Sequence, residues 1–80
     1  MEEQEKRQLI ARLHRLEGQV RALEAKLAND NDAITTVIQM KAVIAAARGC
    51  LNEYARSVTG SVENEETRQA LLKLLLTGSS

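Results

Sequence analysis

The chain has 80 residues, which suits one small domain (1–80) that gains from oligomerisation because a short chain buries little surface. The single aromatic residue, Tyr54, argues against a stacking surface for single-stranded nucleic acid. Cys50 is the only cysteine, so no disulfide can form within the chain and a reducing cytoplasmic location is favoured. We expect neither a signal peptide nor a transmembrane segment, and no membrane partner.

The net charge is zero, but the charges are unevenly distributed. Lys6 to Val58 holds nine basic and five acidic residues, a balance of +4, whereas acids gather at both ends of the chain. A symmetric oligomer would multiply this positive charge, which is compatible with a nucleic-acid partner. There is no phosphate-binding loop, no dinucleotide-binding glycine pattern and no nucleophile motif, so we expect no enzyme and no cofactor.

A regular apolar pattern predicts a first helix over about residues 3–28. Its members recur at alternating steps of four and three: Leu9, Leu13, Leu16, Val20, Leu23 and Leu27. Gly18 lies inside this predicted helix, where glycine lowers helix stability by about 1 kcal/mol relative to alanine. We therefore expect a neighbouring helix or a phosphate to approach Gly18 closely. The polar residues Asn29 to Asp32 predict a turn.

A second helix is predicted over about residues 32–58, with two apolar stripes. The first stripe, the regular seam, follows alternating steps of three and four: Val37, Met40, Ile44, Ala47, Leu51, Tyr54 and Val58. The second stripe lies off this seam: Ile34, Ile38, Val43, Ala46 and Cys50. One antiparallel partner helix cannot cover so wide a surface, so two hairpins should pair into a four-helix bundle. Asn64 is a candidate N-cap for a short, leucine-rich third helix over about residues 65–76. The expected fold class is therefore all-α.

Basic and amide side chains follow one face of the first helix. Arg12, Arg15 and Gln19 are spaced for that face, and Lys41 and Arg48 share a face of the second helix. Arginine can contact phosphates in bidentate fashion, and glutamine can contact a phosphate or a base edge. By spacing alone, a solvated face with ordinary i,i+4 pairs is the better explanation of the pattern.

Residues 12–21, RLHRLEGQVR, are similar to the signature R-L-x-R-[IL]-E-G-Q-[VI] of the CsoR/RcnR/FrmR family of small all-helical bacterial transcriptional repressors. Residues 39–43, QMKAV, resemble the family's Q-I-x-A-V. The resemblance implies a homodimeric four-helix bundle, a dimer of dimers (a homotetramer), and binding to double-stranded operator DNA without a helix-turn-helix. It implies DNA contacts by Arg12, Arg15 and Gln19, with Lys41 and Arg48 adding positive charge.

The resemblance also gives the positions of the family's effector ligands. Counted from Gly18, they fall on Ala33, Val58 and Val62, none of which can coordinate a metal. We therefore expect a DNA-binding repressor without the conventional metal site.

Three alternatives stay open. The chain could be a helical interaction module, or a hetero-oligomer partner, without DNA binding of its own. It could be a thiol-based sensor that works through Cys50, which requires a reactive, accessible thiol. His14 and Cys50 could contribute to a metal site between subunits, although two ligands are too few within one chain.

Overall fold

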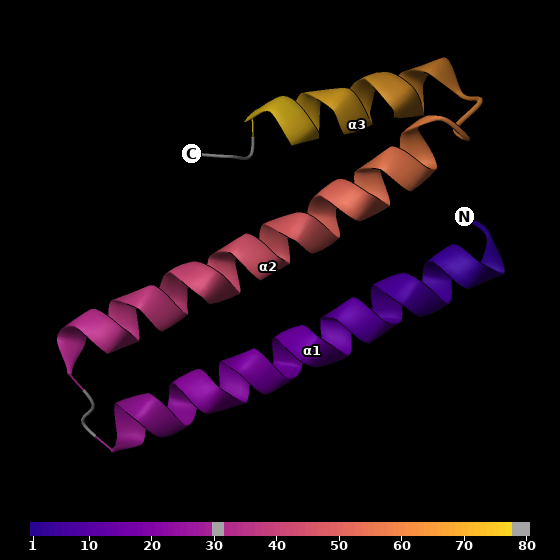
Figure 1. Cartoon of the computed structure of the whole chain (residues 1–80). Helices are drawn as coiled ribbons and strands as arrows, with labels where there is room; N and C mark the ends of the chain where they lie inside the picture. Colours follow the sequence, from indigo (N-terminus) through magenta and orange to yellow (C-terminus); the bar gives the residue numbers. More distant parts are fainter. Residues whose placement is uncertain (30–31, 78–80) are drawn as a thin grey trace.

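The computed structural model describes residues 1–29 and 32–77, which form three helices: α1 (Glu3–Ala28), α2 (Ala33–Thr59) and α3 (Glu65–Thr77). The prediction of an all-α fold is confirmed, and the predicted bounds agree with the observed ones to within one residue. The helices α1 and α2 lie side by side and run in opposite directions, and α3 folds back along the other side of α2 (Figure 1).

At the start of each helix, a polar side chain accepts a hydrogen bond from a nearby backbone N–H group. The Thr35 N–H donates to Asp32 Oδ1 (2.9 Å) at the start of α2, and the Thr67 N–H donates to Asn64 Oδ1 (3.0 Å) at the start of α3. The prediction of Asn64 as an N-cap is thus confirmed. At the start of α1, the Glu2 N–H donates to Glu5 Oε1 (3.0 Å). The predicted turn between α1 and α2 includes residues 30 and 31, which lie outside the described residues.

The three helices form a single layer. The molecule measures 49 × 29 × 13 Å, and its smallest dimension is close to the thickness of one helix with its side chains. Among the described residues, only Thr36 and Cys50 are buried. A single layer cannot enclose a hydrophobic core, because stable domains bury the apolar side of one layer against another.

The apolar pattern of α1 divides between two environments. Leu9, Leu16 and Leu23 are half-buried at the contact with α2. Their heptad companions Leu13, Val20 and Leu27 are exposed, with Leu27 at 53%. The second helix divides similarly: Val43, Ala46 and Cys50 are buried or half-buried, whereas most of the regular seam is exposed, namely Val37, Met40, Ile44, Leu51 and Tyr54. Part of the apolar pattern on each helix therefore closes the hairpin, and the other stripe remains uncovered. Ile34 and Ile38, at 75% and 63% exposure, are uncovered as well.

The uncovered stripes lie on the same side of the layer. Val20 follows the inward-facing Gln19, and Leu51 follows the inward-facing Cys50, so each is rotated by about 100° from its neighbour in the same sense. Because α1 and α2 are antiparallel, equal rotations point to the same side of the pair. We call this the apolar side: Leu13, Val20 and Leu27 of α1 with Val37, Ile44 and Leu51 of α2.

The exposed stripe makes α2 unusually apolar for a helix whose side chains are mostly exposed. By length and composition alone, Ala33–Thr59 could cross a membrane, with a mean hydropathy of 1.3 over its best window. Helix α2 thus passes a test of length and composition alone, and the expectation of no transmembrane segment stays a prediction. The cause is the second apolar stripe, which makes α2 apolar on two of its sides, and the core helix of a soluble protein passes the same test.

The helix starts make stability dependent on acid pH. The Glu2 backbone N–H and then the Ser57 hydroxyl lower the pKa of Glu5, and the Thr35 N–H and hydroxyl lower the pKa of Asp32. Their stabilising contribution is complete above the ordinary pKa values of 4.5 and 3.8 and is lost as the pH falls through the lowered values of the folded state. The urea concentration at the unfolding midpoint should therefore decrease when the pH is lowered below about 4. In the double variant Glu5→Gln/Asp32→Asn, which keeps a capping side chain at position 32, the urea midpoint should decrease less over the same change of pH. An equal decrease in the variant and in the wild-type chain would contradict this assignment.

Gly18 offers a second test. Among the described residues, no atom outside the neighbouring backbone of α1 lies within 4 Å of a Cβ added at Gly18, so the expected close approach by a neighbouring helix is not made by α2. Gly18→Ala should therefore raise the free energy of unfolding by about 1 kcal/mol, measured by urea denaturation, because alanine is the better helix former. A lower free energy of unfolding would instead place part of a second copy against Gly18.

Candidate nucleic-acid interface

A groove runs between α1 and α2 on the side of the layer opposite the apolar side. Arg15 precedes the inward-facing Leu16 and Gly49 precedes the inward-facing Cys50, so both are rotated away from the apolar stripes. The groove has a volume of ≈ 330 Å³ and is lined by Arg12, Arg15, Leu16, Gln19, Ala45, Ala46, Gly49 and Cys50. The small residues of α2 leave room for the long side chains of α1. We call it the basic groove.

Arg12 crosses from α1 to α2. Its Nε lies 3.3 Å from Glu53 Oε2, and the Arg12 side chain stays 46% exposed whereas that of Glu53 is 24% exposed. A Cβ added at Gly49 would lie 3.3 Å from Arg12 Nη1, so the absence of a side chain at 49 makes room for the guanidinium. The sequence interpretation missed Glu53. The available signal was an acidic residue three positions after Cys50, on the inward stripe that faces a basic residue of α1.

Arg15 and Gln19 occupy different environments. The Arg15 side chain is exposed, and among the described residues it forms no ion pair. Gln19 is half-buried, and its Oε1 atom is buried without a hydrogen-bond partner. Arg15 is thus free to meet a ligand on the open side of the groove, whereas the Gln19 amide lies deeper between the helices.

Lys41 and Arg48 lie elsewhere. Neither lines the basic groove, and each precedes an inward-facing residue of α2, Val43 or Cys50, by two positions. Two positions along a helix turn a side chain to nearly the opposite face. Of the five candidate DNA-binding residues, the structure therefore brings together Arg12, Arg15 and Gln19, and it leaves Lys41 and Arg48 on the far side of α2.

The three positions to which the resemblance assigns the family's effector ligands do not form a cluster among the described residues. Ala33 is the first residue of α2, Val58 lies in its last turn, and the Val62 carbonyl accepts a hydrogen bond from Arg68 Nη2 (2.7 Å) beyond the helix. Throughout residues 1–29 and 32–77, no three His, Cys, Asp or Glu side chains gather closely enough to hold a metal ion. The donor set does not fit a copper, nickel or cobalt site, because alanine and valine side chains carry no donor atom.

His14 and Cys50 do not come together either. Cys50 is a free thiol, buried against α1 at 8% exposure. His14 precedes the inward-facing Leu16 by two positions and therefore points away from α2.

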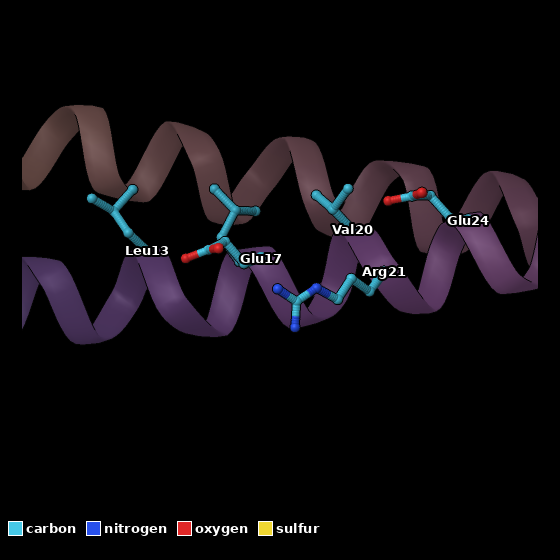
Figure 2. Close-up of a pocket in the computed structure, with 6 residues that line it drawn as sticks. Leu13, Glu17, Val20, Arg21 and Glu24 are labelled. Carbon is cyan, nitrogen blue, oxygen red and sulfur yellow. The ribbon is translucent and has the colours of Figure 1, made fainter.

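The apolar side carries an open hollow along α1. It has a volume of ≈ 530 Å³, and all of its lining residues belong to α1: Leu13, Leu16, Glu17, Val20, Arg21 and Glu24. Figure 2 shows Leu13 and Val20 extending in the same direction from the helix, with Glu17 and Glu24 beside them. A hollow formed by one helix is an uncovered helix side, not a closed ligand site.

The comparison with known proteins assigns the chain to a family. A family model described as metal-sensitive transcriptional repressor matches residues 5–76, nearly the whole chain. No curated protein and no solved structure matches the chain significantly. The resemblance to CsoR/RcnR-type proteins is thereby confirmed, and the chain belongs to the family of metal-sensitive transcriptional repressors.

Proposed function

We propose that this chain is a cytoplasmic DNA-binding repressor that acts as a homo-oligomer and does not bind a metal at the usual family positions. Membership in a repressor family, which is not a class of enzymes, supports the general function. The observation that carries the DNA-binding part is the basic groove, where Arg12, Arg15 and Gln19 line one surface on the side opposite the apolar side.

The apolar side supports the homodimer. Six exposed aliphatic side chains lie on one side of a layer 13 Å thick, and leaving them in water is unfavourable. Two hairpins that stack through their apolar sides form a four-helix bundle with a closed core. This stacking leaves the basic grooves on the two outer surfaces, where a DNA duplex can reach them. A dimer of dimers, as the family resemblance implies, would present several such grooves.

Phosphate contacts would supply most of the affinity. Guanidinium groups form bidentate hydrogen bonds with phosphate oxygens, and displaced counterions make such binding fall steeply with salt. The positive charge of +4 between Lys6 and Val58, repeated in each subunit, would attract DNA despite the neutral whole chain. Lys41 and Arg48 would add to this field without lining the groove.

A second candidate is an interaction module, or a hetero-oligomer partner, that does not bind DNA itself. The exposed apolar side favours some helical partner but does not by itself require DNA. The third candidate, a sensor acting through the Cys50 thiol, is disfavoured because Cys50 is buried in the hairpin.

Replacing Arg15 tests the repressor function. Arg15→Ala should weaken binding to a duplex from upstream of the chain's own gene by about tenfold and reduce the salt dependence, because phosphate contacts are lost. Fluorescence anisotropy at several salt concentrations measures both quantities. Arg7→Ala, which removes an exposed arginine of α1 outside the groove, should have a much smaller effect.

Light scattering distinguishes the two candidates. An unchanged oligomer with weakened DNA binding in Arg15→Ala supports the repressor. A wild-type oligomer that binds no duplex at any salt concentration supports the interaction module.

The metal response gives an independent test. Adding Cu(I), Ni(II) or Co(II) should leave the DNA affinity of the wild-type chain unchanged, because Ala33, Val58 and Val62 offer no donors. The triple variant Ala33→Cys/Val58→His/Val62→Cys restores the ligand types that the family resemblance implies and serves as a control that should bind Cu(I). Release of DNA by stoichiometric metal from the wild-type protein would contradict the proposal.

A further inference from the structure

We propose that Glu53 is an internal counter-charge that competes with DNA phosphate for the Arg12 guanidinium and so limits the DNA affinity of the basic groove. This inference rests on the proposed DNA-binding function and adds a residue to it. Glu53 lies on α2, outside the segment that carries the arginines, and it reaches one of them across the hairpin.

The geometry gives Arg12 two possible partners. Its Nε lies 3.3 Å from Glu53 Oε2, and nearly half of the Arg12 side chain remains exposed in the groove. A guanidinium has five N–H donors in one plane, and a bidentate contact uses two that point the same way. The carboxylate occupies the Nε edge, so a phosphate that approaches this edge must displace it.

Arg12 and Glu53 form an ion pair, but the buried carboxylate oxygen of Glu53 lacks a hydrogen bond. Glu53 Oε2 is buried and has no hydrogen bond of good geometry, although its charge lies beside Arg12. The Arg12 Nη1 atom passes directly over Gly49, so the guanidinium is placed along the groove by the lack of a side chain there. Solvent reaches the Arg12 side of the ion pair, where the side chain is 46% exposed, so the pair is weakened by screening and DNA can break it at a cost of about a few-fold in affinity.

The test compares two variants that remove one negative charge each. Glu53→Gln keeps the shape of the side chain and removes its attraction for Arg12. Glu63→Gln is the matched control, because Glu63 is exposed in the connection between α2 and α3. Binding to the upstream duplex is measured by anisotropy at fixed salt, and circular dichroism and light scattering check helix content and oligomeric state.

We expect Glu53→Gln to bind about fivefold more tightly than the wild-type chain and Glu63→Gln to bind less than about twofold more tightly. In an Arg12→Gln background, the gain from Glu53→Gln should shrink to that of Glu63→Gln, because the competed group is gone. Equal gains from the two single variants, or weaker binding by Glu53→Gln with unchanged helix content, would overturn the proposal.

The outcomes separate this inference from the function on which it rests. If the wild-type chain binds the upstream duplex with salt dependence and the two single variants are equal, the repressor function stands and the role of Glu53 falls. If neither the wild-type chain nor Glu53→Gln binds duplex DNA at low salt, both fall. The comparison of the two single variants decides the role of Glu53 even if Arg12→Gln abolishes binding.

Discussion

Three helices arranged in one layer cannot bury their apolar side chains against one another, and the other features of the structure depend on this constraint. The layer is 13 Å thick, so α1 touches only α2, α2 touches α1 and α3, and the remaining stripes lie in water. Among the described residues, Cys50 is the only apolar side chain buried within the single chain. A second layer would add the hydrophobic free energy that one layer lacks, and in the proposed function another copy of the chain provides that layer.

The same constraint separates the functions of the two sides. Covering Leu13, Val20 and Leu51 by a second layer leaves the opposite side, with Arg12 and Arg15, facing outward. Small residues of α2, Ala45 and Gly49 among them, keep that outward side open as a groove. The helix α2 therefore contributes large apolar side chains to one side of the layer and small residues to the other.

The chain keeps the family's signature residues but lacks the ligand types that the resemblance implies for metal binding. The signature that carries the arginines is intact in α1, whereas the positions of the effector ligands hold Ala33, Val58 and Val62. Ala33 lies at one end of α2, and the two valines lie at the other. In the proposed function, DNA binding and metal binding depend on different residues, so one can persist without the other.

The sequence by itself determined the three helices, because the periodic leucines and the capping residues Asp32 and Asn64 act over a few residues of chain. It also placed Arg12, Arg15 and Gln19 on one helix face, since that depends only on helical spacing. It could not decide which half of each apolar pattern closes the hairpin, nor that Arg12 meets Glu53 over Gly49. Those features depend on how α1 and α2 are rotated against each other, and this rotation is fixed by side-chain packing between residues distant in the chain.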